Sequence, residues 1–241
     1  MINLNCFSKI SLILFSFFYL ISPNTAIGET LKKDELLKIE NTLNSKKLDL
    51  LDKYFEDEAA KMIIDQFTKL TKDFPNLVWN LTKLKNDNSD DHILEVKVYG
   101  KKSVDKIDYI FNSKFNYVFS YSNGKISNGL IKNHLTTIRN DNNALDIEVS
   151  IPDKVLTGSK YFLDVIIINP LDEELIAGGL KTHEVHSVME NSIKLEPLVS
   201  GGIFKETRAP SEPGVQIWSG IIAHHQGLIT FTKAVDIVEE F

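Results

Sequence analysis

Cysteine is almost absent from this sequence. The chain has 241 residues and a single cysteine, Cys6, which precedes the first apolar run. Downstream of Gly28 there is no thiol, so disulfides, thiol catalysis and Cys-ligated zinc are excluded from that part of the chain. A hydrophobic core must therefore hold the fold, and a chain of this length can supply one.

Arginine is also scarce. Of the 27 basic residues only Arg139 and Arg208 are arginines, and the net charge is −6. Nucleic acids and anionic membranes select proteins with clustered positive charge, and arginine above all. The composition therefore predicts no nucleic-acid partner.

Recognised catalytic motifs are missing as well. No G-x-S-x-G elbow is present to position a nucleophile, and Ser200-Gly201-Gly202 lacks the Lys-Ser/Thr pair of a phosphate-binding loop. His183-Glu184-Val185-His186 lacks the i, i+4 histidine spacing of a zinc protease. These absences favour a protein that is not an enzyme and predict no cofactor.

Long apolar runs are confined to the N-terminus. Residues 10–21, ISLILFSFFYLI, carry no charge and follow Lys9; a Ser-Pro-Asn breaker and the small residues Ala26 and Gly28 come next. This layout predicts a secretory signal peptide over 1–28, cleaved after Gly28, and an exported protein of the periplasm or an equivalent compartment. The run is shorter than the roughly 20 residues of a membrane span, so we expect no transmembrane segment in the mature chain. The alternative is an uncleaved anchor.

Residues 29–141 begin with helical patterns and continue with strands. Apolar residues recur at helical spacing over 57–74, and Pro75 ends that pattern. The period then changes to two, and aromatic residues occupy odd positions from Tyr109 to Tyr121. Asn123-Gly124 predicts a two-residue hairpin turn, and Gly129 is a candidate site for a β-bulge that shifts the phase of the return strand.

Three helices, a bent antiparallel sheet and the Ser122-Asn123-Gly124-Lys125-Ile126 hairpin resemble the nuclear transport factor two-like cone fold. The resemblance covers roughly residues 30–141. It implies a sheet that wraps around a helix and leaves a conical pocket, used in some members for catalysis and in others for assembly.

Two interpretations of the aromatic strand remain open. The aromatic side chains form the wall of a pocket for a small apolar ligand, or they form an ordinary core beneath the helix 57–74. The pocket interpretation predicts a cavity of about 300 Å³ or more. Its candidate ligand-binding residues are Trp79, Tyr109, Phe111, Phe115, Tyr117, Asn128 and His134.

Residues 144–241 show short strands separated by turns, with no helical pattern between them. The segment from Ile151-Pro152 to Asn169-Pro170 resembles the first strands of bacterial immunoglobulin-like domains, and this resemblance implies a β-sandwich. Val215–Ala223 and Leu228–Val238 predict a closing hairpin. His183, His186, His224 and His225 suggest a weaker alternative, a metal site, although His224 and His225 are adjacent on a predicted strand and should face opposite ways.

The predicted fold class is therefore a two-domain α+β protein, with helices packed on a curved antiparallel sheet followed by an all-β immunoglobulin-like sandwich. The predicted function is non-enzymatic binding or assembly, with a protein partner or self-association. The alternatives are binding or isomerisation of a small apolar ligand in the first domain and, more weakly, metal handling in the second.

Overall fold

The computed structural model describes residues 31–85, 92–127, 129–141, 145–168, 175–184, 193–198, 201–225 and 227–241. The predicted signal peptide and its cleavage site at Gly28 lie outside these residues, as do Asn128 and His186.

The predicted α+β fold class is wrong, because the protein is mostly β. Of the described residues 57% lie in strands and 19% in helices, and the helices are three short ones. The helical patterns of the sequence are real, but they are confined to residues 33–73. A large antiparallel sheet, rather than a helix-packed cone followed by a separate sandwich, dominates the structure.

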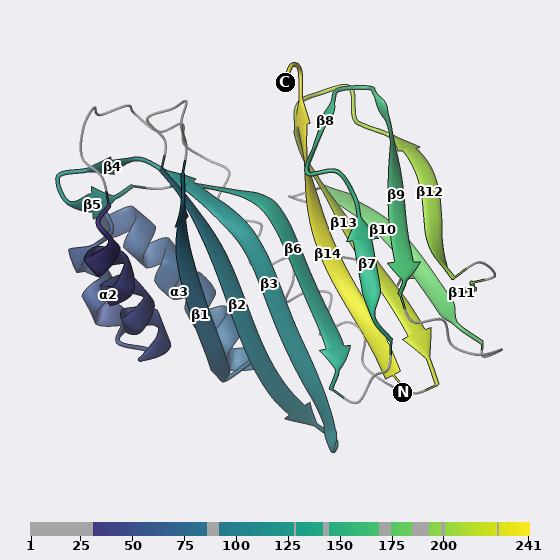
Figure 1. Cartoon of the computed structure of the whole chain (residues 1–241), viewed down its shortest axis with the longest axis horizontal. Coiled ribbons are helices and arrows are strands. Elements are labelled where there is room, and N and C mark those ends of the chain that lie inside the picture. Colours follow the sequence, from purple (N-terminus) through teal and green to yellow (C-terminus); the bar gives the residue numbers. More distant parts are fainter. Residues whose placement is uncertain are drawn as a thin grey trace. The chain divides into compact units, whose positions relative to one another are not determined.

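Three helices come first: α2 (Lys33–Asn44), the 3₁₀ helix η1 (Leu48–Lys53) and α3 (Asp57–Asp73). The strands follow in the order β1 (Asn76–Leu84), β2 (His92–Val104), β3 (Ile107–Phe119), β4 (Tyr121–Ser122), β5 (Lys125–Ile126), β6 (Leu130–Asn140), β7 (Ile147–Ser150), β8 (Lys154–Leu156), β9 (Lys160–Ile167), β10 (Ala177–Glu184), β11 (Glu196–Pro197), β12 (Gly202–Arg208), β13 (Gly214–His224) and β14 (Gly227–Val238) (Figure 1). No helix within the described ranges is long and apolar enough to cross a membrane.

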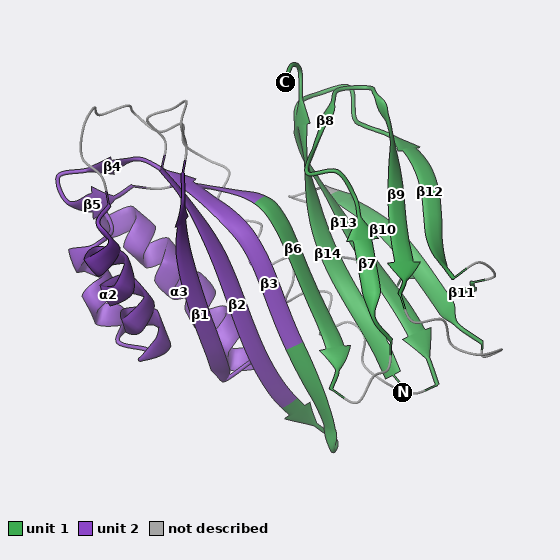
Figure 2. Ribbon diagram, viewed as in Figure 1, with its two compact units in different colours: residues 1–12, 103–110, 133–241 green, residues 13–102, 111–132 purple. Residues whose placement is uncertain are grey.

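The large sheet has the strand order β1-β2-β3-β6-β14-β13-β10-β11, and β8 pairs in parallel with β14. A second sheet has the order β12-β9-β7. Contacts divide the chain into two compact units (Figure 2). Unit 1 contains residues 103–110 and 133–241, and the described part of unit 2 contains residues 31–102 and 111–132. The prediction of a domain boundary near Asp141 stays a prediction.

In unit 2 the helices lie along one face of β1, β2 and β3 (Figure 1). The α3 stripe has the predicted spacing, and Phe67, at its centre, stacks on Trp79 of β1 with ring centroids 5.7 Å apart. Near the end of the helix Phe74 packs against Phe111 of β3, with centroids 5.0 Å apart. Aromatic pairs at these distances add to the stability gained from burial.

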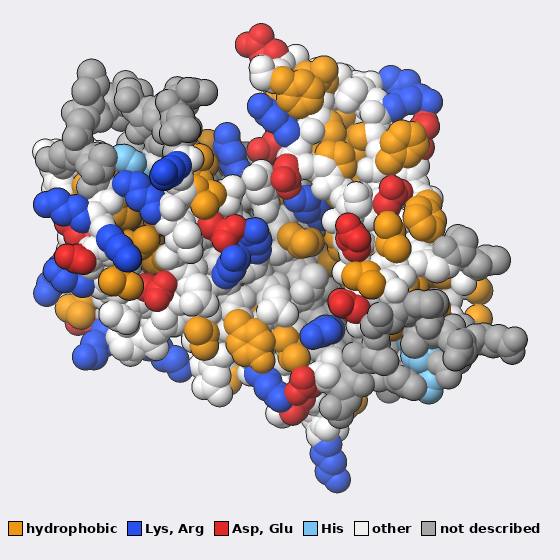
Figure 3. Space-filling view, viewed as in Figure 1, with side chains coloured by type: hydrophobic (Ala, Val, Ile, Leu, Met, Phe, Trp, Pro, Cys, Tyr) orange, Lys and Arg blue, Asp and Glu red, His pale blue; other side chains and the backbone are white. Residues whose placement is uncertain are grey.

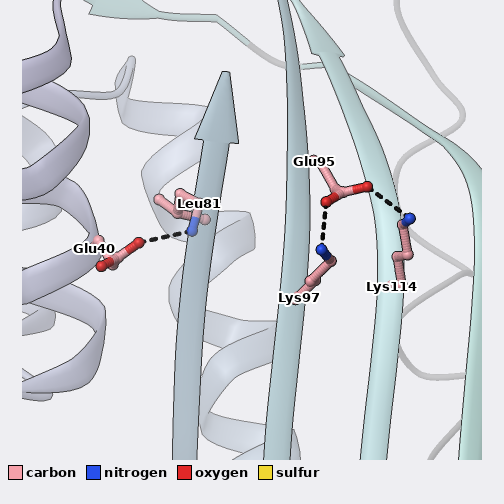
Figure 4. Close-up of polar contacts among 5 residues, drawn as sticks. All are labelled: Glu40, Leu81, Glu95, Lys97 and Lys114. Carbon is pink, nitrogen blue, oxygen red and sulfur yellow. Dashed lines mark hydrogen bonds and ion pairs between the residues drawn. The ribbon is translucent and has the colours of Figure 1, made fainter. Parts of the chain in front are cut away.

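Strand β1 ends the sheet order, and helix α2 covers its free edge. The side chain of Asn44 donates a hydrogen bond to the carbonyl oxygen of Trp79 (2.9 Å) and accepts one from the backbone N–H of the same residue (2.7 Å). Glu40 accepts a hydrogen bond from the N–H of Leu81 at 2.7 Å (Figure 4). These side chains use backbone groups that would otherwise accept another strand.

Away from that edge, a charged cluster joins β2 and β3. Glu95 contacts Lys97 and Lys114, each at 2.7 Å (Figure 4). The hydrogen bonds from Lys114 and then Lys97 lower the pKa of the Glu95 carboxyl. Exposed pairs of this kind contribute little stability individually.

The predicted hairpin after β3 is confirmed. Asn123 and Gly124 both have positive φ, at 52° and 73°, as a type I′ turn requires. The alternation of buried and exposed residues along the return strand β6 does shift. The residue at which it shifts is Asn133, with φ 53°, and not Gly129. Ile131 and His134 are buried while the two residues between them are exposed. Gly129 has a different constraint, since a Cβ there would lie 2.4 Å from the carbonyl oxygen of Val118.

Unit 1 has a hydrophobic core of its own. Alternate residues of β9 are buried and pack with Trp218 of β13 and Phe231 of β14. The indole N–H of Trp218 donates a hydrogen bond to the Tyr161 hydroxyl at 2.8 Å, which satisfies a buried donor. The predicted closing hairpin is confirmed as β13 and β14, whose register runs from Gly214 opposite Ile237 to His224 opposite Gly227.

Candidate functional site

A cavity of about 80 Å³ lies in unit 2 between helices α2 and α3 and the sheet. Three of the seven predicted pocket residues line it: Trp79, Phe115 and Tyr117. The rest of its described wall is aliphatic or aromatic, apart from Gln66. The volume is well below the roughly 300 Å³ of a site for a drug-sized ligand, so this cavity does not reach the predicted size.

The other predicted pocket residues lie elsewhere. Tyr109 and Phe111 are buried in the core but do not line the cavity. Asn128 is outside the described residues. His134 is fully buried in the part of β6 that belongs to unit 1, 2.9 Å from the hydroxyl of Thr136.

Burial controls the chemistry of the titratable groups at these positions. It lowers the pKa of His134 to about 3, with the charge of Lys233 as a smaller cause, so the imidazole is neutral at ordinary pH. Burial also raises the pKa of the Tyr117 phenol, whose hydroxyl donates to the carbonyl oxygen of Ser127 at 3.1 Å. Neither group is tuned near neutral pH for proton transfer.

The sequence patterns did not single out Gln66. It lies on α3 beside Phe67, is 4% exposed, and neither atom of its side-chain amide has a hydrogen-bond partner among the described residues. The indole nitrogen of Trp79 likewise has no hydrogen-bond partner among the described residues, and the Trp79 residue is 7% exposed. A glutamine three residues after Ile63, inside an apolar stripe, was the available signal.

The histidines do not form a metal centre in the described part of the chain, where no cluster of three or more potential ligands exists. His224 and His225 do not face opposite ways, because β13 ends at His224 and His225 lies in the turn. Their rings meet, with Nδ1 of His225 3.0 Å from Nε2 of His224. His183 lies separately on β10, and burial lowers the pKa of its imidazole.

The second candidate site is the outer face of the β12-β9-β7 sheet in unit 1. Phe162 on β9 is 61% exposed and Phe204 on β12 is 55% exposed. Phe204 pairs with Asp164 and Phe162 pairs with Glu206, so the two rings are diagonal neighbours on one face. Ile166 on β9 and Ile168, just after β9, are also exposed, and Asp164 lies between Phe162 and Ile166 on the same face. In Figure 3 hydrophobic side chains gather over β9 and β12, with acidic ones between them.

Charge is unevenly distributed around these exposed apolar residues. Lys160 and Arg208 pair at one end of the face, where Lys160 also contacts Glu206 at 2.6 Å. Asp146 and Glu148 lie at the opposite end, on the β7 side, where the N–H of Ile168 donates to the carbonyl oxygen of Asp146 and Glu148 pairs with Ile166. One corner of the face is therefore cationic and the opposite corner acidic.

Comparison with known proteins adds one match. Residues 142–238 match a family model described as "Domain of unknown function (DUF8623)". No curated protein matches the chain. The matched range contains every strand from β7 to β14, and so the whole of the exposed β12-β9-β7 face.

Proposed function

We propose that this is a non-catalytic binding protein that self-associates through the outer face of the β12-β9-β7 sheet. The observation that carries the proposal is the exposure of Phe162 and Phe204 side by side on a regular sheet face. Large aromatic side chains gathered on a surface are typical of protein interaction sites, where they supply most of the binding free energy.

The charge pattern favours a second copy of the chain as the occupant. A two-fold arrangement brings the same face of two copies together. If the two-fold axis runs midway between the two charged corners, the Lys160–Arg208 corner of one copy meets the Asp146–Glu148 corner of the other. Phe204 and Asp164, which pair halfway along the face, then lie nearest the axis. The face is thus complementary to itself, and such complementarity fixes the register of an interface.

Charge reversal tests this arrangement. Arg208→Glu and Glu148→Arg should each weaken self-association, because each places like charges at both meeting corners. The double variant R208E/E148R should recover most of the affinity, since opposite charges then face each other again. The measurement is the dissociation constant of the dimer, from sedimentation of the full chain at several protein concentrations. If the losses of dimer affinity in the two single variants simply added up in the double variant, the proposed arrangement would be contradicted.

We also propose that the protein is exported, on the strength of the uncharged run 10–21 and the small residues before position 29. The chain recovered after expression with its own N-terminus should begin at Glu29. Intact-mass measurement checks this, and a chain recovered only with residues 1–28 attached would contradict cleavage.

A further inference from the structure

The two larger sheets end in four outer strands, and three of these are closed to further pairing. Side chains of α2, Asn44 and Glu40, bond to the backbone of β1. Strand β11 has only two residues, one of them Pro197, and β7 has four. Bonded backbone groups, proline and short length are usual means by which proteins prevent the addition of another strand to a sheet edge.

Strand β12 is the fourth outer strand, and it has none of these protections among the described residues. It ends the order β12-β9-β7 (Figure 1), and within the described ranges no strand pairs with its other side. Its seven residues contain no proline and pair with β9 without interruption, from Gly202 opposite Ile166 to Arg208 opposite Lys160. The open edge is therefore long enough for another strand.

Two backbone hydrogen bonds that flank β12 fix the direction of its peptide groups. The N–H of Ile167 donates to the carbonyl oxygen of Gly201 at 2.9 Å, and the N–H of Ala209 donates to that of Ser159 at 2.8 Å. Hydrogen-bonded pairs alternate along antiparallel strands, so the odd-numbered residues of β12 are the ones that bond to β9.

The even-numbered residues point their peptide groups the other way. The N–H and carbonyl groups of Phe204, Glu206 and Arg208 therefore face the open edge, and all three residues are exposed. A row of alternating backbone donors and acceptors is complementary to another extended chain, which is how several peptide-binding domains add a strand to a sheet.

The side chains of β12 select the chemistry of the added strand. Residues 203–204 are apolar, and Lys205 and Arg208 in the second half are exposed cations. Glu206, between these cations, already contacts Lys160 at 2.6 Å. The second half of the edge is thus locally basic, although the chain has a net charge of −6. An acidic segment complements this half.

From this combination we infer that β12 binds an extended segment of a partner protein as an added antiparallel strand, acidic in its first half and apolar in its second. Antiparallel pairing brings the acidic half beside Lys205 and Arg208 and the apolar half beside Phe204. A second copy of the chain is a poorer occupant, because the register that uses the whole strand places two copies of Lys205 opposite each other.

The test uses the full chain and the peptide acetyl-Glu-Thr-Thr-Glu-Phe-Val-amide, with amide hydrogen exchange followed by ¹H–¹⁵N NMR. Saturation with the peptide should slow exchange of the Phe204 and Glu206 amides at least tenfold. The amides of Lys205 and Thr207, which bond to β9, should keep their rates. This alternating pattern is the signature of an added strand, because binding to side chains alone makes no hydrogen bonds to the edge.

Variants of β12 separate the backbone contribution from the charge contribution. Glu206→Pro removes an N–H that faces the edge and leaves the bonds to β9, since proline is tolerated on edge strands. It should raise the dissociation constant of the peptide at least tenfold relative to Glu206→Ala, which loses the same side chain. Lys205→Glu should weaken binding of the acidic peptide and strengthen binding of acetyl-Lys-Thr-Thr-Lys-Phe-Val-amide.

The inference is independent of the proposed self-association, which uses the outer face of the sheet rather than its edge. Phe162→Ser, on the neighbouring strand β9, should weaken self-association and leave peptide binding unchanged. Either proposal can therefore fail without the other.

Three results would overturn the inference. The first is exchange at Phe204 and Glu206 that millimolar acidic peptide does not slow. The second is equal affinity of the wild type for the acidic and the lysine peptides. The third is protection of these two amides that grows with protein concentration in the absence of peptide, because the occupant would then be a second copy of the chain.

Discussion

At the scale of single residues, buried polar side chains carry more information here than the aromatic band does. The aromatic residues of β3 were compatible with either a pocket wall or a hydrophobic core, and most of them are core residues. Gln66, by contrast, interrupts an apolar helix face and lines the cavity. Its sequence context could have identified it, but the absence of a partner depends on the three-dimensional surroundings and was not predictable.

His134 makes the stability of the fold depend on pH. Its folded-state pKa of about 3 lies below the ordinary value of 6.5. Between these values the unfolded chain binds a proton and the folded chain does not, so stability is complete above pH 6.5 and falls as the pH is lowered toward 3. His134→Gln, which keeps a neutral hydrogen-bonding group, should lose less stability, by roughly 3 kcal/mol at pH 4.

Urea unfolding of both proteins at pH 7, 5.5 and 4 measures that difference. The free energy of unfolding of the wild type should approach or fall below that of H134Q as the pH decreases. Two curves that stay parallel from pH 7 to pH 4 would show that His134 does not titrate in this way.

At the scale of elements, helix α2 protects the edge strand β1. Asn44 makes two hydrogen bonds to the backbone of Trp79. Asn44→Ala should therefore lower the free energy of unfolding by about 1–3 kcal/mol and increase aggregation, because it leaves a backbone donor and acceptor of an edge strand open. Asn41→Ala, at an exposed position of the same helix, is the control.

The measurement is urea unfolding together with light scattering during incubation at moderate temperature. If Asn44→Ala and Asn41→Ala were equal in both stability and scattering, the edge-protection account would be wrong.

The element scale is also where the sequence was most informative. The helical spacing over 57–74 corresponds to α3, and Asn123-Gly124 identified the hairpin turn, because both signals depend only on neighbouring residues. The bulge was misplaced for the same reason. Glycine at 129 was the conspicuous candidate, but Asn133 adopts the left-handed conformation, which asparagine tolerates better than most residues.

At the scale of the whole molecule, local sequence patterns were insufficient to predict which strands pair with one another. Strand β6 pairs with β14 through Leu135–Arg139 and Ile229–Lys233, segments about 90 residues apart in the chain. Alternation shows which residues share a face of a strand, but it does not show which strands are neighbours. The predicted α+β class was wrong because most of the described residues lie in strands of a large antiparallel sheet. The two predicted domain types followed from treating the halves separately and stay predictions, and the pairing of β6 with β14 joins segments from both halves.

Self-association through the β12-β9-β7 face is the central claim about the whole molecule, and sedimentation equilibrium of the full chain tests it most directly. The wild type should be a dimer whose dissociation constant rises at least tenfold in F162S/F204S. Tyr99→Ser, which removes a side chain 42% exposed on a strand of unit 2, should leave the dimer intact. A wild-type chain that remains monomeric at high micromolar concentration, or a dimer that F162S/F204S does not weaken, would contradict the claim.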